Sequence, residues 1–322
     1  MKGPTPSDFL SLSSEIASGV REIFAAKELN WAMTGEKDGQ HIGDVTVDDY
    51  VIERLVGGGF STFSEESGWH GEGRYLVVVD PVDGSTNASR GLPSFALSLA
   101  LVEGEELLAG RVFDLSNGDL YSAESGKGAS LNNQLLKGAT GEILLSNAIL
   151  ALNGFPGRYY GWRQYRALGS AALEISMVAA GKIDAFVDHS ESGLAPWDYL
   201  GALAIAREVG CSFAWLSDYQ SQSQGQVQSP FKFEDGFGGG GVVGEYDGES
   251  NANLEGDGGD QRFVEAVGGS GGRVECNSAP ANLLEVEITN SLRVALSGGR
   301  RRLLVARTDQ LLDELLSALG RP

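Results

Sequence analysis

Two aspartates stand three residues apart directly after a short apolar run. The segment DPVDGSTN begins at Asp80 and follows the run YLVVV at residues 75–79. Asp80 and Asp83 could share one hard cation, with the carbonyl oxygen of Val82 as a further ligand. Ligands that are all oxygens favour Mg²⁺ or Mn²⁺ over zinc. The spacing alone is a weak signal, because aspartate at the end of a strand is also a common turn residue.

Two further acidic positions could join this pair. Glu65 and Glu66 lie in the segment SEESG at residues 64–68. So many acids close together would repel one another without a cation. Asp198 follows Trp197 at the start of a predicted helix. An aspartate at that place can face a crevice, and it can equally serve only as a helix cap.

The first half of the chain has the pattern of helices packed on a largely antiparallel sheet. Helical spacing of apolar residues predicts helices over residues 6–27 and 47–56, the second with Thr46 as its N-cap. The continuous apolar run at residues 75–79 predicts a strand buried on both faces. Apolar segments between Gly, Asp and Asn turns predict an antiparallel meander over residues 94–102, 107–113 and 120–123.

The second half alternates strands and helices. We predict helices over residues 170–180, 198–209 and 308–319, and strands over residues 143–146, 148–152, 183–188 and 302–306. Residues 217–280 are rich in Gln, Ser, Gly, Asp and Glu and predict a flexible surface insertion, with order returning at Leu283. The predicted division is an α+β subdomain at residues 1–141, which carries most of the metal ligands, and an α/β subdomain at residues 142–322.

Composition excludes several classes of function. The chain has 322 residues and a formal net charge of −20, which argues against a nucleic-acid partner. It is 42% hydrophobic, but its apolar runs are too short to cross a bilayer, so no membrane partner is expected. The first residues lack the apolar core of a secretory signal, which predicts a cytoplasmic protein. Cys211 and Cys276 lack metal-ligand spacing and are interpreted as isolated thiols.

Three segments together resemble one known family. These are SEESG at residues 64–68, DPVDGSTN at residues 80–87 and WDYLGALAIAREVG at residues 197–210. In this order and at these separations they resemble the inositol monophosphatase and fructose-1,6-bisphosphatase superfamily. Asn87-Ala88 before Pro93, together with Gly35, Asp38 and Gly39 ahead of Asp44, looks most like its archaeal branch. In that branch one enzyme often accepts both inositol phosphates and fructose 1,6-bisphosphate.

The resemblance implies a fold and a set of metal ligands. The fold would be a layered αβαβα sandwich of the sugar-phosphatase type, an α+β / α/β architecture, assembled as a homodimer. Glu65, Asp80 and the Val82 carbonyl would hold a first Mg²⁺, with Mn²⁺ as an alternative and Li⁺ as an inhibitor. Asp80, Asp83 and Asp198 would hold a second ion. A third ion would lie near Glu65 with Asp38 or Asp44.

The resemblance also implies roles in catalysis and substrate binding. Glu65 and the Ser85 hydroxyl would orient a water for in-line attack, with Asp80 completing the catalytic set, and no phosphoenzyme would form. The phosphate oxygens would meet the backbone amides of Gly84, Ser85 and Thr86. Sugar or inositol hydroxyls would meet Gly169, Ser170, Ala171 and Asp188. Helix capping with close packing is the alternative for the first three of these, and an exposed turn residue is the alternative for Asp188.

We therefore expect a phosphatase whose partner is a small phosphate ester: inositol monophosphate, fructose 1,6-bisphosphate, or both. The alternatives are a phosphatase of the same fold acting on 3′-phosphoadenosine 5′-phosphate or histidinol phosphate, and a non-catalytic phosphate-binding relative. Two departures bear on this choice. Ser85 stands where many relatives have threonine, and the segment HSES after Asp188 lacks a basic residue that is frequent in the archaeal branch. Arg158, Arg163 and Arg166 could bind a second phosphate or form a solvated cationic face.

Overall fold

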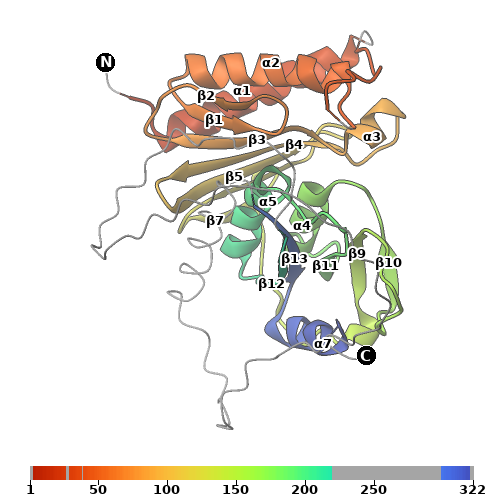
Figure 1. Ribbon diagram of the computed structural model, residues 1–322. Helices are drawn as coiled ribbons and strands as arrows, with labels where there is room; N and C mark the ends of the chain where they lie inside the picture. Colours follow the sequence, from red (N-terminus) through yellow and green to blue (C-terminus); the bar gives the residue numbers. More distant parts are fainter. Residues whose placement is uncertain (1–2, 27–28, 38, 220–298, 320–322) are drawn as a thin grey trace, which may run out of the picture.

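A computed structural model of the chain describes residues 3–26, 29–37, 39–219 and 299–319. These residues form five layers, in which helices and sheets alternate (Figure 1). Helices α1 (Pro6–Ala25) and α2 (Ile42–Gly57) lie on one face of a large sheet. Helices α4 (Ala171–Ala179) and α5 (Pro196–Val209) lie between this sheet and a smaller one, and α7 (Asp309–Leu319) lies on the far side of the smaller sheet. The predicted αβαβα sandwich is confirmed.

The large sheet contains eight strands in the order β2-β1-β3-β4-β5-β6-β7-β8. Only β1 and β3 run parallel, and every other neighbouring pair is antiparallel. The predicted meander is therefore present, extended by short strands that have no clear alternation in the sequence. The strands are β1 Ser61–Ser64, β2 Gly68–His70, β3 Leu76–Asp83, β4 Ala96–Glu103, β5 Glu106–Asp114, β6 Leu120–Glu124, β7 Gly128–Leu131 and β8 Gln134–Leu135.

The start of helix α2 differs from the prediction. The helix begins five residues before Val47, and its N-cap is His41 rather than Thr46. The backbone amide of His41 donates to the carboxylate of Asp44 at 3.0 Å, which completes the first turn. The Thr46 hydroxyl instead donates to the carbonyl of Ile42 at 2.9 Å. Threonine can bond to the preceding turn in this way inside a helix, so it does not always mark a helix start.

The smaller sheet contains five strands in the order β10-β9-β11-β13-β12. The strand predicted at residues 143–146 is wrong, because a 3₁₀ turn, η1 (Leu145–Asn147), occupies this place. The amide of Leu145 donates to the Glu314 carboxylate of α7 at 2.7 Å and is thus not available to a strand neighbour. The five strands are β9 Ile149–Asn153, β10 Gln164–Arg166, β11 Ala185–Asp188, β12 Ser212–Tyr219 and β13 Arg300–Ala306.

The predicted insertion begins inside an ordered element. Residues 217–219 belong to strand β12, so the boundary placed at Ser217 is too early. The rest of the predicted insertion and the return of order at Leu283 lie outside the described residues. Tyr219 and Arg300 are paired across β12 and β13, so the chain leaves and re-enters this sheet at neighbouring positions.

Helix α5 packs unusually close to the large sheet. A Cβ atom on Gly110 of β5 would overlap the carbonyl oxygen of Gly201 and would lie 2.7 Å from the Cβ of Ala204. A Cβ atom on Gly201 would lie 2.8 Å from the Ser98 hydroxyl. The two glycines therefore let the helix and the sheet approach at backbone contact distance. This contact sets the height of the N-terminal end of α5 above the sheet.

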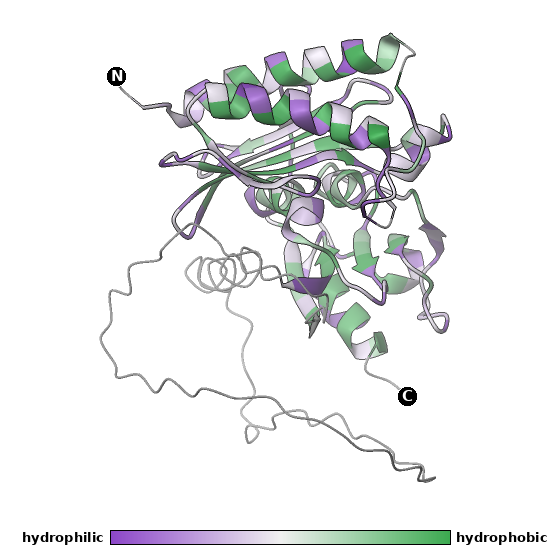
Figure 2. Ribbon diagram, turned by 45° about the horizontal axis from the view of Figure 1, so that its top comes forward, coloured by the Kyte–Doolittle hydropathy of each residue, from purple (hydrophilic) through white to green (hydrophobic). Residues whose placement is uncertain are grey.

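The apolar residues form clusters between the layers. Figure 2 shows green apolar stretches along the strands of both sheets, while green and purple alternate around the outer helices. One cluster lies between α1, α2 and the large sheet, a second lies around α4 and α5, and a third lies under α7. Within the described part of the chain, no helix combines the length and the apolar character needed to cross a membrane.

Candidate metal centre

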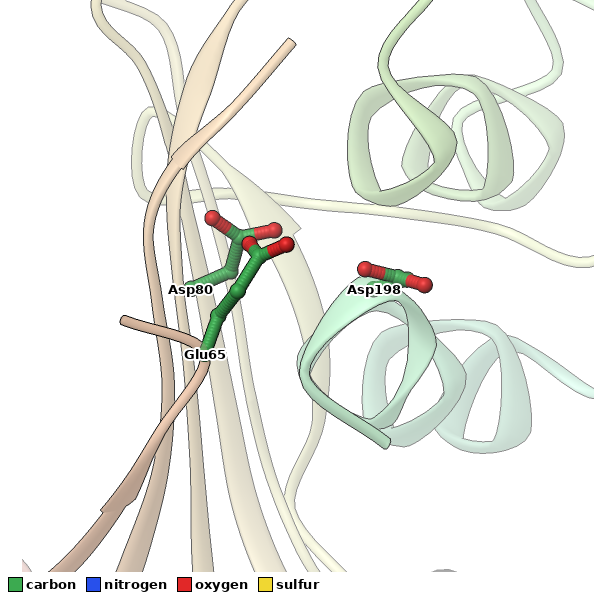
Figure 3. Close-up of side chains that lie close together, drawn as sticks. All are labelled: Glu65, Asp80 and Asp198. Carbon is green, nitrogen blue, oxygen red and sulfur yellow. The ribbon is translucent and has the colours of Figure 1, made fainter. Parts of the chain in front are cut away.

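Three carboxylates from distant parts of the chain meet between the large sheet and helix α5. Glu65, Asp80 and Asp198 each offer an oxygen, and these oxygens all lie within 4.8 Å of one another. Figure 3 shows Glu65 and Asp80 on the sheet side, with their carboxylates directed toward Asp198 at the end of the helix. Asp80 is buried, whereas Glu65 and Asp198 remain partly exposed. The group is therefore accessible from one side.

The parallel pairing of β1 and β3 brings the first two acids together. In this register Ser64 is the partner of Val79, and the backbone amide of Glu65 donates to the Val79 carbonyl at 3.1 Å. Glu65 thus follows the end of β1 at the level of Asp80. The Asp80 carboxylate accepts a hydrogen bond from the Val82 amide at 3.0 Å, which holds it in place over the turn.

Asp198 is both a helix-capping residue and a member of the acidic group. It is the third residue of α5, and its Oδ2 accepts a hydrogen bond from the Ala195 amide at 2.7 Å. Its carboxylate also faces Glu65 and Asp80 (Figure 3). The two interpretations of this residue from the sequence are therefore compatible.

Asp83 lies beside the group but is held by a different element. The strand pairing of β3 with β4 shifts register between Asp80 and Asp83, so the two side chains do not follow simple alternation. The Oδ2 atom of Asp83 accepts hydrogen bonds from the Ser170 hydroxyl at 2.6 Å and from the Ala172 amide at 2.7 Å. The structure does not include Asp83 in the group of three, and its role as a metal ligand stays a prediction.

Burial gives all four carboxyls raised pKa values. Burial is the largest cause and repulsion by neighbouring acids adds to it, so the pKa values of Glu65 and Asp80 lie well above the usual range. Burial also raises the pKa of Asp83 to about 6 and that of Asp198 to about 7. The guanidinium of Arg300 opposes this effect by lowering the pKa of Glu65 and Asp198. The raised pKa values mean that the negative charges of these carboxylates are costly in the folded protein. A hard divalent cation bound between the closely spaced oxygens would neutralise those charges.

The loop after Asp83 turns sharply into a short helix. Gly84 has a φ of 92°, and a Cβ atom there would lie 2.9 Å from the Ser94 carbonyl and 3.0 Å from the Gly169 carbonyl. Helix α3 (Ser85–Ser89) then begins with Ser85 and Thr86. First-turn amides have no acceptor within their own helix and can meet an anion. The predicted phosphate loop therefore lies directly beside the acidic group.

The predicted substrate residues lie at the start of α4 and the end of β11. Ser170 caps α4 through its hydroxyl, as the alternative interpretation held, and the same hydroxyl donates to Asp83. Gly169 precedes it with a φ of 85°, and Ala171 is the first residue of the helix. Asp188 is fully buried, so the alternative of an exposed turn residue is wrong. Its Oδ1 accepts from Asn153 at 3.0 Å, and its Oδ2 is buried without a hydrogen-bond partner.

The structure does not bring Asp44 to the acidic group. Asp44 is buried in α2, and its carboxylate accepts from His41. Its raised pKa has burial as the main cause. Asp38, the other predicted ligand of a third ion, lies outside the described residues. In the part of the chain that the structure describes, Glu65, Asp80 and Asp198 form the one such acidic group.

The predicted arginine cluster lies at the edge of the smaller sheet. Arg158, Arg163 and Arg166 line an open pocket of about 980 Å³ together with aromatic residues such as Phe155 and Tyr159. Arg158 donates to the Ala318 carbonyl of α7 at 2.8 Å, and Arg166 donates to the Tyr165 carbonyl at 2.7 Å. These bonds tie two of the three arginines to the protein itself.

Three residues near the centre were not found from the sequence. Glu174 is a single acid in the apolar helix α4, and this isolation is a signal that could have identified it. Lys37 donates to the Glu65 carbonyl at 3.1 Å, and no sequence signal points to this contact. Arg300 begins strand β13 and donates to the Gly193 carbonyl at 3.2 Å. The order of strands in the smaller sheet brings Arg300 near Glu65 and Asp198, and the sequence does not show that order.

Comparison with known proteins decides the family. The family described as "Inositol monophosphatase family" matches residues 11–258. The chain belongs to the inositol monophosphatase family. A relative in Archaeoglobus fulgidus, named fructose-1,6-bisphosphatase/inositol-1-monophosphatase, is 34% identical over 212 residues, covering 63% of this chain and 82% of that protein. A relative of the same name in Thermococcus kodakarensis is 32% identical, covering 62% and 80%.

Solved structures support the same conclusion. The inositol monophosphatase from Anabaena superimposes with a TM-score of 0.54 at 25% identity, covering 64% of this chain and 83% of that protein. A hypothetical protein from Pyrococcus horikoshii has a TM-score of 0.63 and covers 96% and 98%, but at 20% identity it supports the fold alone. The resemblance inferred from the three segments is thus confirmed, including its archaeal branch. This member of the inositol monophosphatase family is a phosphatase.

Proposed function

We propose that this protein is a Mg²⁺-dependent phosphomonoesterase that hydrolyses inositol monophosphate, fructose 1,6-bisphosphate, or both, with Mn²⁺ as an alternative metal. The observation that carries this proposal is the meeting of Glu65, Asp80 and Asp198 within 4.8 Å of one another. The two archaeal relatives are named for both activities, which supports the substrate class. The alternatives of a nucleotide or histidinol phosphatase and a non-catalytic protein receive no support from the comparisons.

The donor set fits two hard cations. Glu65, Asp80 and the Val82 carbonyl would hold one ion, and Asp80, Asp83 and Asp198 would hold the other. All donors are oxygens, and the raised pKa values of the four carboxyls indicate that the set favours added positive charge. Bound Mg²⁺ supplies the charge that makes water more acidic and stabilises the phosphate and leaving oxygens.

The side chains around the centre position the reactants. The Ser85 hydroxyl and the Glu65 carboxylate orient a water in line with the ester bond. The water oxygen forms a bond to phosphorus as the bond to the leaving oxygen breaks, so no phosphoenzyme is needed. The amides of Gly84, Ser85 and Thr86 hold the phosphate oxygens.

An unpaired polar atom of Asp188 supports a polyol as the substrate. The Oδ2 atom of Asp188 is buried without a partner, and an unpaired buried carboxylate oxygen is costly unless a donor reaches it. A hydroxyl of a sugar or an inositol ring would be such a donor, provided that the side chain, which is fully buried in this structure, opens toward the substrate. As the family resemblance implies, Gly169, Ser170 and Ala171 would contact further hydroxyls of the same substrate. Asn153 fixes the orientation of Asp188 through the bond to Oδ1.

Phosphate release from inositol 1-phosphate and fructose 1,6-bisphosphate tests the proposal. We expect turnover only with Mg²⁺ or Mn²⁺, and we expect Asp83→Asn to abolish it. Asp313→Asn is the matched control, because Asp313 is an exposed acid on α7. Turnover in EDTA, or full activity of Asp83→Asn, would contradict the mechanism. A panel of phosphate esters then ranks the substrates by kcat/KM.

Three further expectations belong to the same proposal. We propose a homodimer in solution, measured by light scattering, and a cytoplasmic location, tested by cell fractionation. We also propose inhibition by Li⁺, measured as a fall in phosphate release at fixed Mg²⁺ concentration. A monomer, a secreted protein, or turnover unchanged by Li⁺ would refute these expectations one by one.

A further inference from the structure

Both backbone polar groups of Leu168 are held by side chains from different parts of the chain. The amide of Leu168 donates to Oε1 of Glu174 at 2.7 Å. The carbonyl of Leu168 accepts from Nδ2 of Asn87 at 2.6 Å, and the same Nδ2 donates to the Ser94 carbonyl at 2.8 Å. The side-chain amide nitrogen of asparagine carries two hydrogens, so these two bonds use both donors of Asn87. The residue before Gly169 is thus clamped between the two halves of the molecule.

The clamp fixes the next two residues against the phosphate loop. Gly169 has a φ of 85°, and a Cβ atom there would lie 3.1 Å from Nδ2 of Asn87. On the other side, the carbonyl of Gly169 would lie 3.0 Å from a Cβ atom on Gly84. The segment therefore has little room to shift in either direction. Ser170 follows directly, and its hydroxyl donates to Asp83 at 2.6 Å.

The Glu174 carboxyl is expensive to bury. Only 1% of the residue is exposed, and its sequence neighbours Leu173 and Ile175 are apolar. Burial raises the pKa of Glu174 to about 8, so the neutral carboxyl predominates at pH 7. A neutral carboxyl still accepts through Oε1, in the same way as a glutamine. Leucine has a similar size and would avoid the cost of burial, but it cannot hold the Leu168 amide.

We propose that Glu174 and Asn87 are positioning residues that fix the Asp83 carboxylate for a divalent cation through Leu168 and Ser170. Neither residue touches the acidic group of Glu65, Asp80 and Asp198. They act on Asp83 through hydrogen bonds to Leu168 and through Ser170, whose hydroxyl donates to the Asp83 carboxylate. The inference rests on the proposed metal-dependent function and gives a role to two residues for which the motifs imply none.

The decisive comparison is between Glu174→Gln and Glu174→Leu. Glutamine keeps the acceptor for the Leu168 amide, and leucine removes it. Mn²⁺ binding to metal-free protein is measured by isothermal titration calorimetry, and folding is checked by thermal unfolding. We expect Glu174→Gln to match the wild type. We expect Glu174→Leu to lose about 10- to 100-fold in affinity at the weaker Mn²⁺ site, as for other residues that support metal ligands.

Activity gives a second readout that a purely structural role would not move. Raising the Mn²⁺ concentration should restore most of the phosphate release of Glu174→Leu, because the ligands themselves are intact. Ser176→Ala is the matched control, since Ser176 is a fully buried polar residue of the same helix with no hydrogen-bond partner for its hydroxyl. This control should bind Mn²⁺ like the wild type. If Glu174→Leu does not fold, Asn87→Ser is used instead. Asn87 is partly exposed, and this variant removes the hydrogen bond to the Leu168 carbonyl.

The outcomes separate this inference from the proposed function. Wild-type affinity at both sites in a folded Glu174→Leu or Asn87→Ser overturns the clamp and leaves the proposed function intact. A Glu174→Gln variant as weak as Glu174→Leu also overturns it, because the acceptor would not be the property that counts. Failure of the wild type to bind Mn²⁺ at all overturns both.

Discussion

Replacing Asp198 by asparagine should make the metal-free protein more stable at pH 8. The pKa of Asp198 is raised from 3.8 to about 7, mainly by burial. Each factor of ten in acidity corresponds to about 1.4 kcal/mol, so the charged form costs roughly 4 kcal/mol in the folded state. Asparagine removes the charge and keeps an oxygen for the Ala195 amide, which now contacts Oδ2 at 2.7 Å. Because the neighbouring acids can adjust to part of this charge in the wild type, we expect the free energy of unfolding to rise by about 2 to 4 kcal/mol.

The pH dependence has a defined sign. A carboxyl whose pKa is higher in the folded than in the unfolded protein binds more protons when folded, so stability falls as pH rises between the two pKa values. For Asp198 this window runs from about pH 4 to about pH 7. Metal-free wild type should therefore be more stable at pH 5 than at pH 8, and Asp198→Asn should reduce that difference. Mg²⁺ should stabilise the wild type at pH 8 far more than the variant.

Urea unfolding in EDTA at pH 5 and pH 8 measures both effects. Asp313→Asn is the control, because it makes the same chemical change at an exposed position and should leave the unfolding free energy unchanged. An Asp198→Asn variant that is less stable than the wild type at pH 8 without metal would refute the reasoning. It would mean that the acidic group is not under electrostatic strain.

Three further predictions follow from backbone geometry. Gly84→Ala should lower the free energy of unfolding by more than about 2 kcal/mol and lower kcat. The reason is that the φ of Gly84 is 92° and that the added Cβ atom would meet two carbonyl oxygens. An unchanged melting temperature would contradict this prediction. Gly110→Ala should destabilise the fold by more than about 3 kcal/mol in urea, because its Cβ atom would overlap α5, and an unchanged midpoint would count against that packing. Replacing residues 220–299 by Asn-Gly should leave a folded, Mg²⁺-dependent phosphatase, because Tyr219 and Arg300 are already paired. Loss of the cooperative unfolding transition would show that the replaced residues are needed for folding.

Sequence reasoning found the acidic residues because their signals are local. A buried strand that ends in DPVD predicts where Asp80 lies, and the neighbouring acids of SEESG point to the same crevice. Asp198 was ambiguous, since a residue near a helix start can cap the helix or face a site. The structure resolves this because the same carboxylate does both.

The parts that were missed depend on contacts between distant residues. The register shift after Asp80 turns Asp83 toward α4, and nothing in the segment itself announces that shift. The predicted start of α2 lies five residues too late because His41 is not a usual N-cap, whereas Thr46 resembles one. Glu174 gave a visible signal as a lone acid among apolar residues, but its target, the Leu168 amide, is set by tertiary structure.

The glycine contact beneath α5 bears on which ion the proposed metal centre would fit. Gly201 lies one turn after Asp198, so the height of α5 over β5 fixes how far the Asp198 carboxylate stands from Asp80. Mg²⁺ and Ca²⁺ differ by about 0.3 Å in their usual distance to oxygen. A methyl group at Gly110 would overlap the Gly201 carbonyl oxygen and would push the helix away from the sheet. In the proposed metal centre, the fit of Mg²⁺ rather than Ca²⁺ would therefore depend on two residues that have no side chain to offer as a ligand.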